Sequence, residues 1–345
     1  MRRLLTFLLA VGLPVLVAAA AVDALRGAEP SAETGTRTVE TVRTPPAPAW
    51  LEGGVGEVQR LAREGVRGTL YLNADGCLDG NVRRLRALGL PTLEFAEGPR
   101  SQTCSFTLSA DGEYTAGAEA VWSPQGPLFA STTGPAELTL INAEQPGDLK
   151  LAGSAPAFRP DGTFTHMHAG RVVEWTTNCA EATSVVSPAI SPGPDVGPYC
   201  VRPVVSAAAL GRALPPDVRL QSVDALAWLS DSHLLALLET RERVWVAAYE
   251  NGSPRHASPL AISADAVRVD PTGEYVGILA RSTVVVHDRD TAIPWGSSLE
   301  TRAFDWSPDG EWLAYATTGN VYLVRTSDWT TQFRLPLSTT GLAWR

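Results

Sequence analysis

The stretch Asp305-Trp306-Ser307-Pro308-Asp309-Gly310-Glu311-Trp312-Leu313-Ala314-Tyr315-Ala316 reads as a strand, a tight turn and a second strand. Pro308 presets φ for the second position of a type I turn, Asp309 can bond the local backbone, and Gly310 accepts the positive φ that closes the hairpin. On either side of the turn the side chains alternate with period two, which is typical of half-buried strands. The stretch therefore predicts an antiparallel hairpin.

Weaker copies of this hairpin recur upstream, with turn-to-turn spacings of mostly about 36 to 41 residues and one gap of about 70. Alternating segments follow each copy, so one copy corresponds to one four-stranded antiparallel blade. A unit of this length that returns in this way indicates a β-propeller. We expect an all-β propeller of about six blades over residues 68–345, with an insertion at about 178–220. An extra half copy, Phe106–Gly112, is expected to supply the outer part of the first blade.

The last residues repeat the phrase that opens a blade. The segment Gly341-Leu342-Ala343-Trp344-Arg345 resembles Ala227-Trp228, the start of an earlier copy. A propeller has to hide the edge strands of its first and last blades. We therefore expect Leu342–Trp344 to pair near Leu70–Leu72 and to complete the first blade.

Two sets of residues fall at equivalent positions of the copies, hence one per blade and far apart. We interpret the first set as turn-forming residues and not as a carboxylate cluster, and the second as aromatic residues packed between sheets. Loop tryptophans, Trp295 and Trp329 among them, are better candidates for exposed contacts. The turn set is Asp75, Asp111, Asp161, Asp231, Asp309 and Gly310, and the aromatic set is Trp122, Phe158, Trp228, Trp306 and Trp344.

The phrase WSPDG at residues 306–310, followed by an alternating strand, resembles the repeats of TolB-type and WD-like bacterial propellers. Proteins with such repeats include envelope interaction scaffolds and the propeller halves of serine peptidases. The resemblance implies the fold, and its last copy is the closest to the family pattern. The chain lacks the Gly-His and Trp-Asp dipeptides of eukaryotic WD repeats, and it lacks a recognisable TolB amino-terminal domain.

Residues 1–27 predict the compartment. Arg2 and Arg3 precede an uncharged apolar run, residues 4–22. This run is long enough to cross a bilayer as an uncleaved anchor. Alternatively, the alanine-rich segment at its end offers cleavage sites for a secretory signal peptide. Both interpretations predict an extracytoplasmic protein, either anchored in the membrane with its N-terminus in the cytoplasm or secreted.

Two further segments separate this run from the repeats. Residues 28–50 are rich in Pro, Thr and Ala, which predicts an extended stalk. Residues 51–67 have short helical character, and we expect this segment to pack on the propeller as a lid or plug. A second helix is predicted at Ser206–Leu214 within the insertion, with Ser206 as its N-cap.

The chain has four cysteines, Cys77, Cys104, Cys179 and Cys200, which allow three pairings. Pairing of nearest neighbours, Cys77 with Cys104 and Cys179 with Cys200, closes two short loops and agrees with an oxidising compartment. The alternative is four reduced, buried thiols. A CxxC spacing is absent, so metal binding by these thiols is not expected.

A search for catalytic and cofactor motifs finds little. The chain contains no GxSxG, no phosphate-binding loop and no dinucleotide fingerprint, and we expect no cofactor and no catalytic residue. His166 and His168 share one face of a predicted strand and are weak metal candidates without a third ligand. A formal charge of −9 and a single lysine, Lys150, argue against nucleic acid as a partner.

Two functions remain open. The first is a monomeric, non-enzymatic propeller that binds a protein, peptide or glycan of the cell envelope. The alternative is a hydrolase or lyase with dispersed residues at the mouth of the central channel. The fold alone does not decide between them, but the absence of clustered His, Glu and Arg in the loops favours the first.

Overall fold

The computed structural model describes residues 55–73, 77–134, 136–145, 148–176, 184–186, 199–260 and 263–345. The chain divides into two units, 1–44 and 45–345, and every described residue belongs to the second. The predicted anchor or signal peptide and the predicted stalk lie outside the described residues, so the expectation of an apolar N-terminal helix stays a prediction. Within the described ranges, no helix is long and apolar enough to cross a membrane.

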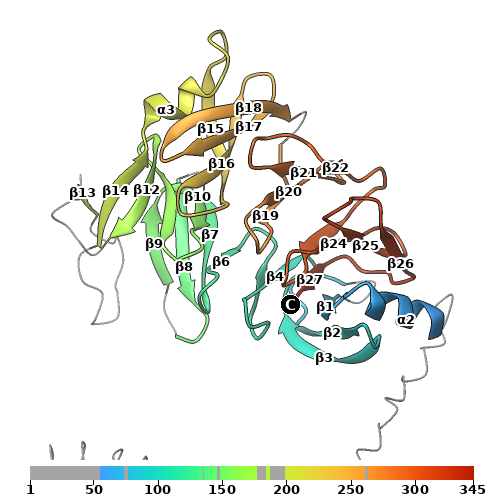
Figure 1. Cartoon of the computed structure of the whole chain (residues 1–345). Coiled ribbons are helices and arrows are strands. Elements are labelled where there is room, and N and C mark those ends of the chain that lie inside the picture. The colour runs from blue at the N-terminus through green and yellow to red at the C-terminus, as the bar shows by residue number, and fades with distance from the viewer. Residues whose placement is uncertain are drawn as a thin grey trace, which may run out of the picture. The chain divides into compact units, whose positions relative to one another are not determined.

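The described residues of the second unit form seven antiparallel sheets (Figure 1). The first sheet has the order β27 (Leu342–Trp344), β1 (Gly68–Leu72), β2 (Arg83–Leu90) and β3 (Glu94–Ser101). The second consists of β4 (Phe106–Leu108) and β5 (Thr115–Gly117). The third has β6 (Val121–Trp122), β7 (Leu128–Gly134), β8 (Glu137–Asn142) and β9 (Asp148–Ala152). The fourth has β10 (Ser154–Phe158), β11 (Phe164–His168), β12 (Arg171–Thr176), β14 (Tyr199–Val205) and β13 (Ser184–Val186).

The last three sheets follow the same plan with four strands each. The fifth has β15 (Leu220–Trp228), β16 (His233–Thr240), β17 (Val244–Glu250) and β18 (Ser253–Leu260). The sixth has β19 (Ala266–Val269), β20 (Tyr275–Ala280), β21 (Thr283–Asp288) and β22 (Trp295–Gly296). The seventh has β23 (Ala303–Trp306), β24 (Trp312–Ala316), β25 (Val321–Arg325) and β26 (Gln332–Leu335).

The sheets form a closed ring. The first strand of each sheet contacts the first strand of the next, in the order β27, β4, β6, β10, β15, β19 and β23, and β23 returns to β27. The molecule is therefore a β-propeller, as the repeats predict. The expected number of six blades is wrong: the half copy at Phe106–Gly112 does not join the first sheet, because Phe106–Leu108 pairs with Thr115–Gly117 as a sheet of its own.

The predicted closure is confirmed. β27 pairs antiparallel with β1, with Leu70 opposite Trp344 and Leu72 opposite Leu342. The backbone N–H of Arg345 also donates to the carbonyl of Thr69 at 3.0 Å. The edge of β1 is thus covered by residues about 270 positions away in the sequence.

Most repeat tryptophans use the indole N–H to connect one sheet with the sheet before it. Trp122 donates to the Thr107 hydroxyl at 2.8 Å, and Trp228 donates to the Thr165 hydroxyl at 2.8 Å. Trp306 likewise donates to the carbonyl of Arg268 at 3.0 Å. Buried indole N–H groups usually find such an acceptor, and here these bonds connect neighbouring sheets while the rings fill the core. Trp306 and Trp228 are buried, as is Phe158, whereas Trp122 is half-buried.

Two helices accompany the sheets. Helix α2 (Val55–Arg63) buries Val58 and Leu61 in the core shared by the first and seventh sheets. Arg60 of this helix lies over the ring of Phe333 on β26, 4.3 Å from its centroid. The helix therefore packs on the propeller, as expected, beside the outermost strand of the seventh sheet. The role of a lid or plug stays a prediction.

Helix α3 (Ala207–Arg212) lies in the insertion, and the hydroxyl of Ser206 accepts a hydrogen bond from the amide of Ala209 as its N-cap. The insertion also supplies β13, which pairs with β14 and gives the fourth sheet its fifth strand.

Replacement of Trp344 by Ala tests the closure. Trp344 is fully buried in the core shared by the first and seventh sheets, so Trp344→Ala is expected to lower the free energy of unfolding by about 4 kcal/mol. Urea denaturation followed by tryptophan fluorescence measures this loss. The control, Leu299→Ala at a site 41% exposed, should change it by less than about 0.5 kcal/mol. A loss below about 1 kcal/mol for Trp344→Ala would contradict closure by β27.

Candidate functional site: a groove beside the two-stranded sheet

The second sheet has two strands where a full blade has four. The sheets on either side of it are therefore less completely covered than other sheets of the ring. β24 in the seventh sheet is buried along its whole length, because sheets cover both of its faces. In the third sheet, Ala130 of β7 and Leu138 of β8 pack toward the fourth sheet. The opposite face carries Phe129 and Ser131, which are only partly buried. One apolar and one half-exposed face are typical of a sheet that is covered on one side.

On the other side of the second sheet, a groove of about 670 Å³ lies over the first sheet. Its lining comes from β1, β2 and β3 and from the turn between β4 and β5. Small residues, Ala87 and Ala96 among them, leave the space open, and Tyr71 lies beside them. Gly112 and Glu113 contribute the turn.

The turn that forms one wall of the groove is rigidly bonded. The hydroxyl of Ser109 accepts from the amide of Tyr114 at 3.0 Å and donates to the carboxylate of Asp111. Asp111 also accepts from the amide of Glu113 at 3.0 Å, and these hydrogen bonds hold the pKa of Asp111 below its usual value. Gly112 has φ of 77°, and a Cβ there would lie 3.2 Å from the Tyr71 hydroxyl, so the turn approaches β1 as closely as a glycine allows.

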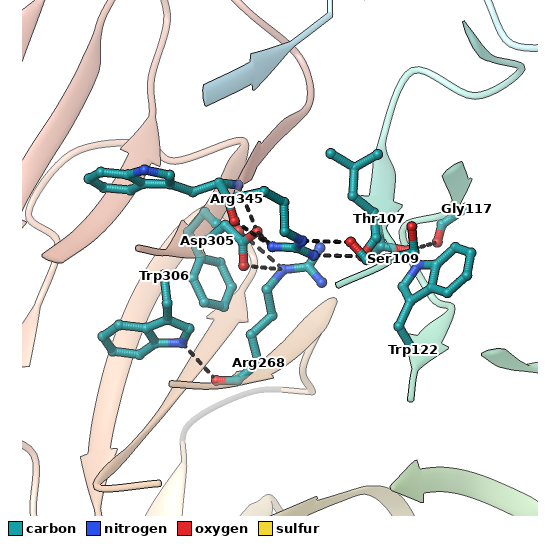
Figure 2. Close-up of polar contacts among 11 residues, drawn as sticks. Thr107, Ser109, Gly117, Trp122, Arg268, Asp305, Trp306 and Arg345 are labelled. Carbon is teal, nitrogen blue, oxygen red and sulfur yellow. Dashed lines mark hydrogen bonds and ion pairs between the residues drawn. The ribbon is translucent and has the colours of Figure 1, made fainter. Parts of the chain in front are cut away.

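Arg345 ties this turn to the centre of the ring (Figure 2). Its Nε donates to the carbonyl of Ser109 at 2.8 Å and its Nη2 to the carbonyl of Leu108 at 2.6 Å. Its Nη1 donates to Oδ2 of Asp305 at 2.9 Å, and the backbone N–H of Trp344 donates to the same oxygen at 2.9 Å. The guanidinium therefore joins the first, second and seventh sheets.

Arg268 completes this central arginine cluster of Arg268, Asp305 and Arg345. Its Nε lies 3.8 Å from Oδ1 of Asp305 and donates to the carbonyl of Phe304 at 3.1 Å. The pKa of Arg268 is lowered, mainly because the guanidinium is buried. The Asp305 carboxylate opposes this shift, and the charge of Arg345 adds to it. The carboxylate of Asp305 faces two arginines and a backbone amide, so the cluster fastens inner strands to one another.

The two histidines with metal-like spacing do not gain a third ligand in the described part of the chain, where no cluster of three metal-binding side chains occurs. Both lie on β11, with ring centroids 6.1 Å apart. Nδ1 of His168 is 3.0 Å from the carbonyl of Ala152. His166 is buried against the ring of Phe164, and burial, followed by the neighbouring His168, lowers its pKa to about 4.

The remaining turn residues are dispersed around the ring. Asp309 accepts from the hydroxyl of Ser307 and the amide of Glu311, and Asp161 accepts from the amide of Thr163. Asp231 is exposed. In this turn the hydroxyl of Ser230, and not the carboxylate of Asp231, accepts a hydrogen bond from the backbone amide of His233. Asp75 lies outside the described residues, and Gly310 has φ of 72°.

The first predicted disulfide, Cys77–Cys104, is present and joins the loop after β1 to the loop after β3. Cys200 is buried in β14, whereas Cys179 lies outside the described residues, so the second pairing stays a prediction. Trp295 lies on β22 and not in a loop, whereas Trp329 lies in the turn after β25. The two rings stack with centroids 5.9 Å apart against the core between the sixth and seventh sheets, so the expectation of exposed contacts is wrong for both.

Sequence reasoning missed the groove and the central arginine cluster. The cluster draws one residue each from β19 and β23 and one from the end of the chain, so no local motif announces it. The groove had a signal: about 14 residues separate the turn at Asp111 from the next turn at Gln125, too few for a four-stranded unit.

Comparison with known proteins finds likeness in fold. No protein-family model matches the chain, and no curated protein matches it in sequence. Among solved structures, the β-propeller domain of Cps50 (Swd1) from Myceliophteria thermophila is similar, with 12% identity over 80% of this chain and 92% of that chain and a TM-score of 0.43. A provisional 6-phosphogluconolactonase from Bacteroides fragilis has 11% identity over 81% of this chain and 98% of that chain, with a TM-score of 0.46.

Apo AztD from Citrobacter koseri is also similar, with 8% identity over 81% of this chain and 98% of that chain and a TM-score of 0.48. These neighbours include a propeller domain and a protein named as an enzyme. At such identities the likeness concerns the fold and not the function.

Replacement of Arg345 by Met tests the link between the ring centre and the groove wall. Arg345→Met removes the three hydrogen bonds that the guanidinium makes to Ser109, Leu108 and Asp305, so we expect a loss of about 2 kcal/mol in the free energy of unfolding. Amide hydrogen exchange should accelerate selectively at residues 106–117. Arg241→Met, at an exposed site, is the control. Unchanged exchange at residues 106–117 would contradict the role of Arg345.

The buried imidazole of His166 predicts a pH dependence. The unfolded chain takes up a proton as the pH falls through 6.5, whereas the folded chain does so only near its pKa of about 4. The free energy of unfolding should therefore fall between these pH values, by up to about 3 kcal/mol. His166→Gln should flatten this dependence in urea titrations, and His256→Gln, at an exposed site, should not. Equal slopes for His166→Gln and the native chain would refute the prediction.

Proposed function

We propose that this chain is a non-enzymatic β-propeller that binds a protein, peptide or glycan of the cell envelope through the groove over the first sheet. The observation that carries the proposal is the groove itself, an open space of about 670 Å³ on a rigid scaffold. Its walls are fixed by the turn bonds of Ser109 and by the contacts of Arg345. A preformed concave surface of this kind is suited to binding, because little order has to be gained when the ligand enters.

The charged residues at the ring centre support binding over catalysis. A hydrolase or lyase at the channel mouth needs an acid or base that can exchange protons with a substrate. The carboxylate of Asp305 is instead engaged by Arg345, by Arg268 and by the amide of Trp344. The observations therefore favour the binding function over the enzymatic alternative.

The proposed location is outside the cytoplasmic membrane. The Cys77–Cys104 disulfide supports this location, since such bonds persist in oxidising compartments. Residues 1–27 would export the chain, either as an anchor through residues 4–22 or as a cleaved signal. The TolB-like character of the WSPDG repeats belongs to the same proposal, as does a monomeric state.

Filling the groove tests the function. Ala96 is exposed on β3 and lines the groove, so Ala96→Trp should occupy the space without disturbing the core. The native full-length chain, screened by microscale thermophoresis against cationic and anionic peptides and envelope oligosaccharides, should bind at least one of them. We expect Ala96→Trp to weaken that binding at least about tenfold, which corresponds to about 1.4 kcal/mol.

The same preparations are to be incubated with chromogenic ester, lactone and glycoside substrates. We expect no turnover above background. Turnover that Ala96→Trp leaves unchanged, without any groove-dependent binding, would overturn the binding function and favour an enzyme.

A further inference from the structure

We propose that the groove accepts an extended polypeptide segment with basic side chains, lying where the third and fourth strands of the second sheet would stand in a complete blade. This inference rests on the proposed binding function and names the class of ligand.

The repeat fixes the shape of the missing piece. Elsewhere in the ring, sheets of four or five strands stand next to one another, but the second sheet ends at β5 after two strands. Neighbouring strands lie about 4.8 Å apart within a sheet, and stacked sheets lie about 10 Å apart. In a complete blade, the third and fourth strands would follow β5 and stack on β2 and β3 of the first sheet, whose residues line the groove. One or two extended strands have the dimensions of this missing piece.

Strand edges border this space. Among the described residues, β3 is the last strand of the first sheet and β5 is the last strand of the second, so neither has a further strand at its outer edge there. A strand added in the plane of the second sheet would pair with the edge of β5. The hydroxyl of Thr115 on β5 donates to the carbonyl of Arg100 on β3 at 2.7 Å, which holds the two edges together at one end. Unpaired edges offer backbone donors and acceptors to an added strand.

The floor of the groove permits close approach of a polypeptide backbone. Ala87 and Gly89 of β2 face Ala96 and Glu94 of β3 across the strand pair. Gly98 follows on the same face but is buried, because the ring of Tyr71 covers it: a Cβ there would lie 3.0 Å from Cδ1 of Tyr71. The open part of the floor is therefore that of Ala87, Gly89 and Ala96. Short side chains leave the space that the side chains of an incoming strand would fill.

The charge of the lining selects basic side chains. Glu94, Glu97 and Glu113 line the groove, and the lining contains no Lys, Arg or His. Glu97 forms an ion pair with Arg84 at 3.3 Å. Within the described ranges, Glu94 and Glu113 have no ion-pair partner.

The charges also extend past the groove along the turn. Tyr114 follows Glu113 in this turn. Burial, followed by the carboxylates of Glu144 and Glu113, raises the pKa of Tyr114. A run of negative charge along one wall attracts arginine or lysine at alternate positions of an extended segment.

The test uses the full-length chain in detergent and a fluorescein-labelled octapeptide in which arginine alternates with threonine and valine. Two matched peptides accompany it: one with glutamate in place of arginine, and one with alternate backbone amides methylated. Fluorescence anisotropy at low salt should give an affinity for the arginine peptide about tenfold or more above that for each matched peptide. The difference from the glutamate peptide should shrink at high salt.

The variant Glu94→Gln/Glu113→Gln removes the two unpaired charges and keeps the shape of the groove. We expect it to weaken binding of the arginine peptide by about tenfold. The matched control is Glu242→Gln/Glu300→Gln, which removes two exposed charges elsewhere and should leave the affinity unchanged. Urea denaturation should show that both variants are as stable as the native chain.

Four results would overturn the inference. Equal affinity for the arginine and glutamate peptides would remove the charge argument, and unchanged binding after backbone methylation would remove the strand argument. Binding of an envelope oligosaccharide alone, sensitive to Ala96→Trp, would refute the polypeptide ligand and leave the proposed function standing. Absence of all groove-dependent binding would refute both.

Discussion

The pairing of β27 with β1 is the constraint on which the rest of the molecule depends. Three residues, Leu342–Trp344, cover the edge of the first strand and insert Trp344 into the core between the first and seventh sheets. Arg345 then extends from that strand to the second sheet and to Asp305 of the seventh. Without these contacts the first and last sheets would present unpaired edges and the core between them would open to water. The ring, its central arginine cluster and the groove wall are therefore consequences of one short strand.

The two-stranded sheet turns a repetitive scaffold into an asymmetric one. In a ring of full blades, each sheet covers its neighbours and no face is favoured for binding. Here the second sheet stops at β5, so the first sheet keeps one face partly open and the third sheet keeps partly buried residues, Phe129 and Ser131, on the corresponding side. The Cys77–Cys104 disulfide and the bonds of Arg345 hold the short sheet and its surroundings in place. The part of the ring with the fewest strands is thus held by a disulfide and by the hydrogen bonds of Arg345.

The repeats predict the fold well because each copy contains the local features that make it fold as a hairpin. Turn glycines with positive φ and alternating strands are local features, and they identified most sheets and the closing strand. The repeats predict too few blades, because the half copy that begins at Phe106 resembles an outer part of the first blade. The sequence of Phe106–Leu108 does not indicate which strand it pairs with. Pairing is decided by the space available in the folded ring and not by the sequence of one strand.

The candidate site was less predictable. Ala87, Gly89 and Ala96 are unremarkable in sequence, and their significance comes from strands that are missing beside them. Arg268 and Asp305 come from β19 and β23 and Arg345 directly follows β27, and only the ring brings the three together. The indole hydrogen bonds of Trp122, Trp228 and Trp306 are an intermediate case: their aromatic character predicted packing, but the acceptor each finds belongs to another sheet.

The distance in sequence between β1 and β27 has a kinetic consequence. Hairpins within each sheet join residues close along the chain and can form early, whereas Leu70 and Trp344 can meet only after the intervening sheets have reached nearly their final places. Completion of the first sheet is then a late event in folding, and until it happens the bare edge of β1 is the surface most prone to join another molecule. Protection of that edge is therefore needed for longer than protection of the hairpins that form within single sheets.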